Sequence, residues 1–308
     1  MAFRIKVEES VAKGIKRMAR GQIERTLAGL TGQNGATQEE VVHDARKRFK
    51  KIRALLRLAR GGLGRKLVAR ENARFRDAAR PLSEVRDAGV LVDAFDQLIK
   101  RCSGRDHPEA IEAVRLALLD HKRQVSRHVL EEEQVIERVT AVAEEARSDV
   151  KRWDVDEDDW TALEGGLKRT YRLGYEAFRA ALDDPDDENL HELRKRVKDL
   201  WYTFNILEPI RPDFTREQGE HADRLADDLG DDHDLAVLKQ FLSEPALPLR
   251  DRSALEAILP LIDRRRAELQ QEAFDLGWKL YSEKPRAFVK RMGAYWNAWR
   301  SEVNAAQL

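Results

Sequence analysis

Apolar residues recur every three or four positions along most of the chain, which is the period of α-helices that bury one face. The clearest example is the segment 41–60, which carries an apolar seam of Val42, Ala45, Phe49, Ile52, Leu56 and Ala59. The segment 190–207 repeats the spacing with Leu190, Leu193, Val197, Leu200, Phe204 and Leu207. Glycine-rich or proline- and acid-rich interruptions predict loops at 32–35, 61–64, 183–188 and 209–213. The pattern predicts an all-α protein.

Local signals at the predicted helix ends refine this picture. Residues 1–8 alternate apolar and polar side chains, which predicts a short extended segment. Thr37 and Glu40 have the spacing of a capping box before the first seam helix. Before the second seam helix, Asp184 is the expected N-cap and Pro185 the first helical residue. Leu229-Gly230, followed by aspartates, predicts a helix end, a turn and a new cap.

Four segments of the first half recur in the same order in the second half, at offsets between 143 and 152 residues. The matched pairs are 14–30 with 166–182, 43–52 with 191–200, 82–91 with 229–238, and 118–123 with 261–266. An ordered set at nearly constant offset indicates an internal duplication. We expect halves at 9–150 and 151–308, each a bundle of roughly four helices, joined near the acidic segment 153–160.

Basic and acidic residues concentrate in different segments of the chain. Basic and acidic residues number 56 each, so the formal net charge is zero. A first stripe of basic side chains runs beside the first apolar seam: His43, Arg46, Lys47, Lys50, Arg53 and Arg57. A second stripe lies beside the second seam: His191, Arg194, Lys195 and Lys198. Acidic residues concentrate instead at 154–159, 183–188 and 227–234, which we expect to be solvated loops and caps.

The first stripe holds no acidic residue, whereas an ordinary solvated helix face mixes signs at i,i+4. Like charges ~6 Å apart repel by roughly 0.7 kcal/mol per pair even in bulk water, so such a stripe is disfavoured without an anion. Two further basic sets match between the halves: Lys16, Arg17 and Arg20 with Lys168, Arg169 and Arg172, and Lys122 and Arg123 with Arg265 and Arg266. Positions between them diverge, such as Lys51 against Asp199, and we expect these to be exposed. Sorted charge of this kind indicates a binding surface for an extended polyanion, with solvated faces as the alternative.

Other chemistry finds little support in the sequence. The single cysteine, Cys102, cannot form an internal disulfide, and no apolar run approaches the ~20 residues of a membrane span. The N-terminus lacks a signal-peptide core, so we expect a cytoplasmic protein without a membrane partner. The segment 61–66 lacks P-loop spacing, and the segment 227–234 has the composition of a helix end, a turn and a new cap, which argues against a metal site. We expect no catalytic residue, metal or cofactor.

The duplicated motifs resemble those of the CHAD family, the conserved-histidine α-helical domains. His-x-x-Arg-Lys-x-x-Lys stands at 43–50 and 191–198, and each copy is followed by Leu-x-x-x-[Arg/His]-Asp, at 82–87 and 229–234. The resemblance covers about residues 9–300. It implies two four-helix bundles related by a pseudo-twofold, a central basic cavity or channel that binds inorganic polyphosphate, and no catalysis. The implied ligands are the first stripe up to Arg53, the whole second stripe, and the matching sets of Lys16 and Lys168. The charge pattern adds Arg57, Lys122, Arg123, Arg265 and Arg266 as candidate ligands.

We therefore expect a polyphosphate-binding, non-enzymatic module of the cytoplasm, with polyphosphate granules as one place of action. A metal-dependent phosphohydrolase is the first alternative, although "EEEQV" (131–135) lacks the final lysine of the Glu-x-Glu-x-Lys signature that a fused triphosphate tunnel domain carries. A nucleic-acid-binding protein is the second, weakly supported by Trp201 and Tyr202 near the second stripe. His43 and His191 either contact phosphate or brace the starts of their helices.

Overall fold

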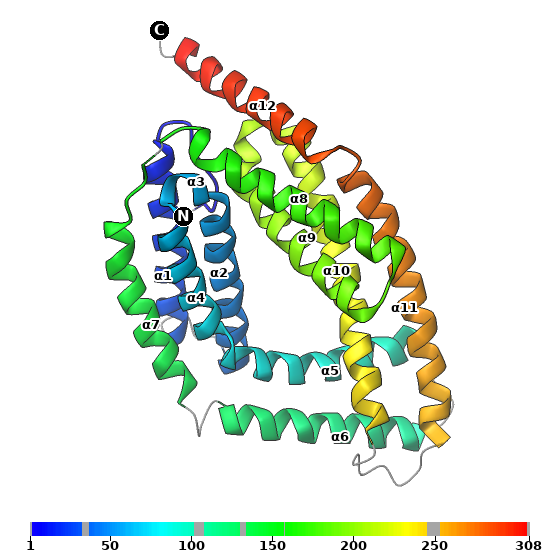
Figure 1. The fold of residues 1–308 in the computed structure, drawn as a ribbon. Helices are drawn as coiled ribbons and strands as arrows, with labels where there is room; N and C mark the ends of the chain where they lie inside the picture. The colour runs from blue at the N-terminus through cyan, green and yellow to red at the C-terminus, as the bar shows by residue number, and fades with distance from the viewer. Residues whose placement is uncertain are drawn as a thin grey trace.

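The computed structural model describes residues 2–32, 37–101, 108–129, 134–156, 158–244 and 253–306. These residues form an all-α structure in which no described residue belongs to a strand (Figure 1). The helices of the first half are α1 (Val11–Leu30), α2 (Gln38–Leu58), α3 (Arg60–Leu63), α4 (Arg65–Ala79), α5 (Pro81–Arg101), α6 (Pro108–Arg127), α7 (Val135–Asp149) and η2 (Val150–Arg152). Those of the second half are α8 (Thr161–Asp183), α9 (Asp187–Leu207), η3 (Glu208–Ile210), α10 (Pro212–Ser243), α11 (Ser253–Leu280) and α12 (Pro285–Ala306).

The two apolar seams form the buried faces of α2 and α9, as the sequence predicts. Phe49 of α2 is completely buried and its ring lies 5.4 Å from that of Phe75 of α4. On α9, Val197 and Leu200 are likewise completely buried. The predicted capping box of Thr37 and Glu40 starts α2. The N-cap of α9 is Asp186, not Asp184, because the Asp186 carboxylate accepts the backbone N–H of Asn189.

Two hydrophobic cores hold the helices together, and both contain residues from the two halves. The central core joins α1, α2, α4 and α7 to α8, α9, the first part of α10, the end of α11, and α12. The second core lies where α5 and α6 meet the end of α10 and the start of α11 (Figure 1). Its completely buried members include Phe95, Leu118, Leu238 and Ile262. The halves expected from the sequence therefore share their cores and do not bury separate ones.

The halves also meet backbone to backbone where α8 crosses the end of α2. A Cβ at Gly166 would lie 1.9 Å from the carbonyl oxygen of Leu58, and a Cβ at Gly61 would lie 2.7 Å from that of Thr161. No side chain fits at such distances, so the glycines permit this close crossing. The predicted loop at 61–64 is therefore mostly helical: α3 runs to Leu63, and Gly64, with φ +73°, separates α3 from α4.

The predicted helix end at Leu229-Gly230 is wrong, because α10 continues through it to Ser243. Both residues are buried where α10 packs on α9 and α11, so tertiary packing outweighs the local glycine signal. The acidic residues 227–234 consequently lie on a helix and not in a solvated loop, and Asp232 is buried.

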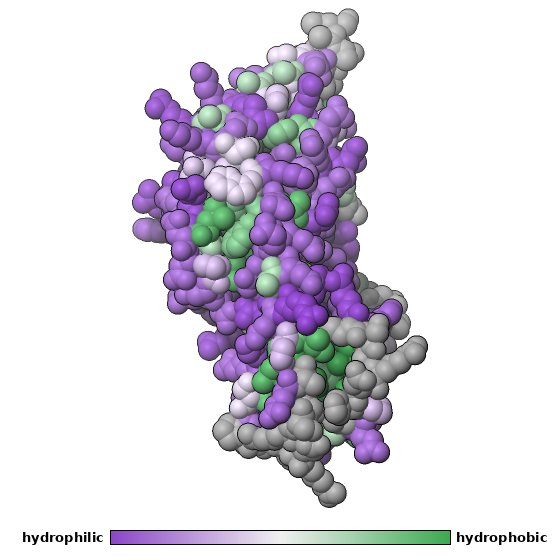
Figure 2. Space-filling model, turned by 90° about the vertical axis from the view of Figure 1, so that its right-hand side faces the viewer, coloured by the Kyte–Doolittle hydropathy of each residue, from purple (hydrophilic) through white to green (hydrophobic). Residues whose placement is uncertain are grey.

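Residues 2–10 contain bends and a turn instead of the continuous extended run expected for 1–8. They are tied to distant helices: the N–H of Ile5 donates to the carbonyl of Ile206 at 3.0 Å, and Arg300 donates to the carbonyl of Val7 at 2.9 Å. Cys102 and residues 131–133 lie outside the described residues. No described helix is both long and apolar enough to span a bilayer, and the face in Figure 2 is mainly hydrophilic.

Candidate functional site

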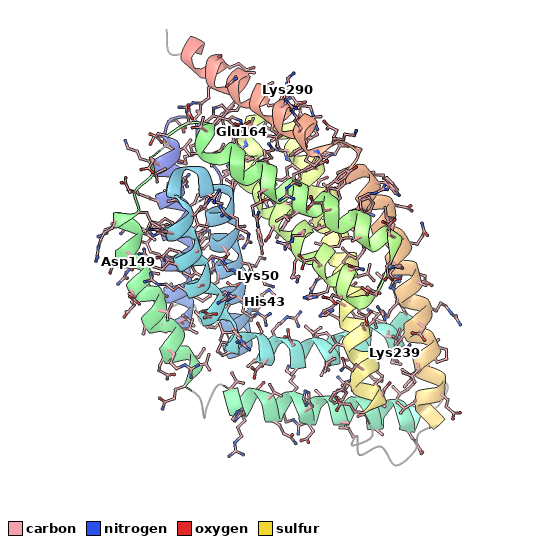
Figure 3. All side chains as sticks on the ribbon, viewed as in Figure 1. His43, Lys50, Asp149, Glu164, Lys239 and Lys290 are labelled. Carbon is pink, nitrogen blue, oxygen red and sulfur yellow. The ribbon has the colours of Figure 1, made fainter. Side chains whose placement is uncertain are left out.

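The two basic stripes are brought together because α2 and α9 pack against each other. Lys50 of α2 interacts electrostatically with Arg46 of its own helix and with Arg194 and Lys198 of α9. We call these four side chains the cationic cluster. Figure 3 shows His43 and Lys50 projecting from α2 toward the side on which α5 and α9 lie.

Lys50 stands at the centre of the cationic cluster. Its side chain is exposed, yet the protein atoms around it remove part of its solvation. This burial, with the repulsion of Arg46, Arg194 and Lys198, lowers the pKa of Lys50 to about 8. A bound anion would restore the lysine's charge.

Arg46 is held in place by the start of α5. Its guanidinium donates to the carbonyl oxygens of Leu82 and Ser83 at 3.0 and 2.9 Å, and lies 3.7 Å from the carboxylate of Asp87. The side chain is only 13% exposed, and burial lowers its pKa. Arg46 therefore fixes α5 against α2 while it contributes charge to the cationic cluster.

Arg194 lies against α10, on the side of the second half. A Cβ at Gly230 would lie 3.1 Å from a guanidinium nitrogen of Arg194, so the arginine lies directly against the α10 backbone. Gly230 matches Ser83 in the sequence repeat, just as Arg194 matches Arg46. The matching positions of the two halves thus make corresponding contacts.

Carboxylates compensate the lysines of the second stripe. Lys198 lies 3.2 Å from both Asp223 and Asp227 of α10, and its ammonium group is 4.4 Å from the centre of the Trp201 ring. Lys195 forms an ion pair with Glu192. By contrast, neither Lys47 nor Lys50 of the first stripe forms an ion pair with any residue that the structure describes.

The two motif histidines lie beside the cluster as neutral side chains at pH 7. Burial lowers the pKa of His43, and the charges of Arg86 and Lys47 lower it further. The pKa of His191 falls to about 4 through burial and through His233, whose ring centre is 4.4 Å away. The buried Nδ1 of His191 has no hydrogen-bond partner among the described residues.

At the other end of the first stripe, the arginines join the halves. Asn72 accepts hydrogen bonds from Arg53 and Arg57 at 3.1 and 3.2 Å, and Arg57 also pairs with Asp199 of α9. The expectation that Lys51 and Asp199 are exposed is wrong: Asp199 is 19% exposed and Lys51 is half-buried beneath Phe3. Burial raises the pKa of Asp199, against the opposing charge of Arg57.

The remaining predicted ligands lie outside the cationic cluster, and many have acidic neighbours. They lie on α1, α6, α8 and α11. Five of them form ion pairs: Arg17–Glu9, Arg20–Glu24, Arg172–Glu176, Arg265–Glu268 and Arg266–Asp232. Arg123, Lys168 and Arg169 are exposed, and the Cε atom of Lys122 would lie 3.8 Å from a Cβ at Gly89. Lys16 is half-buried on α1, which packs on α2 and α7. The i,i+4 pairs of Arg20 and Arg172 are those of a solvated face.

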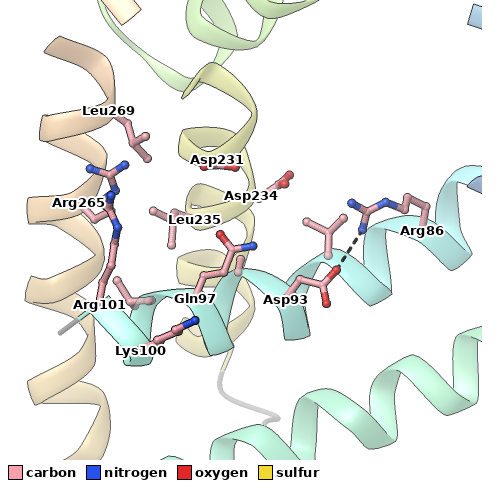
Figure 4. A pocket seen from close by; sticks show the side chains of 13 residues that line it. Arg86, Asp93, Gln97, Lys100, Arg101, Asp231, Asp234, Leu235, Arg265 and Leu269 are labelled. Carbon is pink, nitrogen blue, oxygen red and sulfur yellow. Dashed lines mark ion pairs between the residues drawn. The ribbon is translucent and has the colours of Figure 1, made fainter. Parts of the chain in front are cut away.

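A pocket of about 550 Å³ lies between α5, α10 and α11 (Figure 4). Its basic lining residues are Arg86, Lys100, Arg101 and Arg265, and its acidic ones are Asp93, Asp231 and Asp234. Burial raises the pKa of Asp234 to about 6, although the charges of Arg194 and Arg86 oppose the shift. Asp234 therefore connects this pocket with the cationic cluster.

Sequence reasoning did not select Arg86, Asp231 or Asp234 as site residues. The signal for Arg86 was present, because the repeated Leu-x-x-x-[Arg/His]-Asp motif pairs it with His233. The acidic segment 227–234 does not bring metal ligands together: within the described ranges, no three His, Cys, Asp or Glu residues are placed to hold a metal ion. Asp227 instead faces Lys198, and Asp232 accepts hydrogen bonds from Arg266 and Gln270.

No curated protein matches the chain. The sequence profile of the CHAD domain matches residues 17–243, from α1 to the last residue of α10, and this range contains both copies of the histidine motif and the whole cationic cluster. The chain therefore belongs to the CHAD domain family.

Proposed function

We propose that the protein binds inorganic polyphosphate through the cationic cluster. The environment of Lys50 is the main support for this proposal. Lys50 is exposed, forms no ion pair with a described residue, and interacts electrostatically with three other cations. A chain of phosphates would replace their mutual repulsion with charge-assisted contacts, each contributing roughly 1.5–3 kcal/mol. A single phosphate could neutralise only part of the cluster, so an extended polyanion fits it best.

The two halves, which we interpret as an internal duplication with a pseudo-twofold, act on one ligand in this proposal. Arg46 and Lys50 come from the first half, Arg194 and Lys198 from the second, and a long chain would contact both sides at once. A basic channel would continue along α5 through Lys100 and Arg101, whereas Asp93 compensates Arg86. The protein would act without catalysis, in the cytoplasm and at polyphosphate granules.

Titration calorimetry with long-chain polyphosphate tests the proposal. We expect micromolar or tighter binding that weakens about 100-fold between 50 and 200 mM salt, because about four ion contacts replace condensed counterions. Lys50→Glu should weaken binding about 100-fold. The matched control is Lys290→Glu on α12 (Figure 3), an equal charge change at an exposed lysine outside the cluster. Equal losses in both variants, or salt-independent binding, would exclude the cluster as the site.

Two further measurements distinguish this function from the two alternatives. Release of phosphate from the chain in the presence of magnesium would indicate a metal-dependent phosphohydrolase. Equal or tighter binding of single-stranded nucleic acid would favour the second alternative, for which the half-buried Trp201 beneath Lys198 offers one stacking position.

A further inference from the structure

The pocket between α5, α10 and α11 contains charges of both signs that do not pair with one another. Four charged side chains of its lining form no hydrogen bond or ion pair with any residue that the structure describes: Asp231, Asp234, Lys100 and Arg101. In Figure 4 the two aspartates extend from α10, whereas Lys100 and Arg101 extend from the end of α5. The carboxylates and the cations therefore occupy different walls of the pocket, and both are free to contact a ligand.

The other charged lining residues contribute less, because carboxylates or cations of the protein compensate them. Arg86 lies 3.7 Å from Asp93, and Arg265 lies 2.9 Å from Glu268. A ligand with anionic groups alone would be attracted by the unpaired cations but repelled by the unpaired aspartates, and a purely cationic ligand would meet the converse problem. The pocket thus favours a ligand that carries an anion at one end and hydrogen-bond donors at the other.

The size and the apolar walls of the pocket narrow the choice further. Leu98, Leu235 and Leu269, from three different helices, line the pocket and are buried. The volume of about 550 Å³ lies within the roughly 300–1,000 Å³ that is typical of pockets for drug-sized molecules. It has room for a flat ring against the leucines together with a sugar and a phosphate. A nucleotide combines the ring, the N–H donors and the anion in one molecule of this size.

Asp234 favours one kind of base. It is half-buried, and burial raises its pKa to about 6, so this carboxylate is ionised at pH 7.5. An ionised carboxylate only accepts hydrogen bonds, through two oxygens side by side. Among the common bases, guanine alone presents two adjacent N–H donors, N1–H and the 2-amino group. Next to them is the acceptor O6, to which the amide of Gln97, another lining residue in Figure 4, can donate.

We propose that this pocket binds a guanine nucleotide, with the edge of the base on Asp234 and the 5′-phosphate on Lys100 and Arg101. The inference does not rest on the polyphosphate function, because none of the four residues of the cationic cluster lines the pocket. A phosphate chain that continued along α5 would use the same two cations. A bound nucleotide would therefore exclude the chain from this stretch and leave the cationic cluster open to it.

Titration calorimetry of the full-length chain at pH 7.5 tests the choice of ligand. Guanosine monophosphate should bind at least tenfold more tightly than inosine monophosphate, which lacks the 2-amino group, because a hydrogen bond to the carboxylate is lost. Adenosine monophosphate, which has an acceptor beside its amino group, should bind as weakly as inosine monophosphate. Inorganic pyrophosphate measures anion binding alone and should also bind at least tenfold more weakly. Equal affinity for the adenine nucleotide or for pyrophosphate would overturn the proposal, as would no binding of guanosine monophosphate at about 1 mM.

Asp234→Asn tests the contact with the base. The asparagine amide donates where the carboxylate accepts, so guanosine monophosphate should bind about tenfold more weakly. Xanthosine monophosphate, which has an oxygen at position 2, should become the better ligand. Asp96→Asn is the matched control, since Asp96 is exposed on α5 and pairs with Arg115 outside the pocket, and it should change neither affinity. A guanine preference that persists in Asp234→Asn would show that the base does not contact this carboxylate.

Lys100→Gln/Arg101→Gln tests the contact with the phosphate. Both side chains are exposed, so the fold should not depend on them. The double variant should bind guanosine monophosphate at least tenfold more weakly but guanosine, which has no phosphate, less than twofold more weakly. Equal losses for both probes would contradict the phosphate contact. Guanine-selective binding by a protein that does not bind polyphosphate would overturn only the function proposed above, whereas tight polyphosphate binding without guanine selectivity would overturn only this inference.

Discussion

The first and second basic stripes have nearly the same sequence but different electrostatic surroundings. On α2, Lys47 and Lys50 have no ion pair among the described residues. On α9, the matching residues Lys195 and Lys198 face Glu192, Asp223 and Asp227. The two histidine motifs hold equal numbers of cations but therefore leave unequal charge for a ligand.

The difference shows that a count of basic residues overstates an anion site. A ligand that contacts Lys198 must compete with two carboxylates already 3.2 Å away, whereas a ligand that contacts Lys50 relieves a repulsion. We infer that α2 supplies most of the binding free energy and that α9 adjusts it. Four experiments test this difference between the stripes.

Neutralising each lysine pair should give the largest effect. The double variant Lys47→Gln/Lys50→Gln should weaken polyphosphate binding about 100-fold, because two uncompensated charge-assisted contacts are lost. Lys195→Gln/Lys198→Gln should weaken it about tenfold or less. Calorimetry at fixed salt measures both. Equal losses would mean that the carboxylates on α9 and α10 do not matter.

Removing the carboxylates should make α9 resemble α2. Asp223→Asn/Asp227→Asn frees Lys198 and should tighten binding about tenfold. Asp263→Asn, which frees Lys239 near the other end of α10, is the control and should change affinity less than twofold (Figure 3). Unchanged affinity in the double variant would show that Lys198 does not reach the ligand.

The pH dependence should have the same sign on the two sides but fall in different pH ranges. Lys50 is charged below its pKa of about 8, so binding should weaken as the pH rises through 8, by up to about tenfold per unit. Asp234, beside Arg194, becomes neutral below its pKa of about 6, so binding should strengthen as the pH falls through 6. Affinity titrations from pH 5 to 9 should lose the first change in Lys50→Arg and the second in Asp234→Asn. A wild-type profile that is flat above pH 7.5 would contradict the role of Lys50.

The smallest effect should come from His191. Its pKa of about 4 makes it neutral at pH 7, so it contributes no charge to the second stripe. His191→Gln should therefore change polyphosphate affinity less than about twofold at pH 7, measured by the same calorimetry. A tenfold loss would instead identify His191 as a direct phosphate contact that becomes protonated when the ligand binds.

The sequence predicts the faces of α2 and α9 well, since the period of the apolar residues places Phe49 and Val197 in the core and the lysines beside it. It also supplies the family through the repeated motifs. It does not reveal which cations are compensated, because the partners come from distant helices. Asp223 and Asp227 reach Lys198 from α10, and Asp199 reaches Arg57 from the other half.

The local sequence signals fail most clearly at α10, which continues through a predicted helix end. Leu229-Gly230 has the composition of a helix end, yet Gly230 lies inside the helix, where Arg194 packs against its backbone. Burial on several sides then stabilises the helix through a position of low intrinsic propensity. The same packing places Asp227, from the segment expected to be an acidic loop, on a helix where it pairs with Lys198.

The second core sets an order of events during synthesis. Its first members, on α5 and α6, leave the ribosome well before Leu238 of α10 and Ile262 of α11 can cover them. With more than a hundred residues between Leu118 and Leu238, translation at 5–20 residues per second leaves this surface uncovered for roughly 6–24 s. Contacts so far apart in sequence also form slowly. The nascent first half therefore exposes an apolar surface to which chaperones can bind. A truncated chain that ends near residue 150 should aggregate through the same surface.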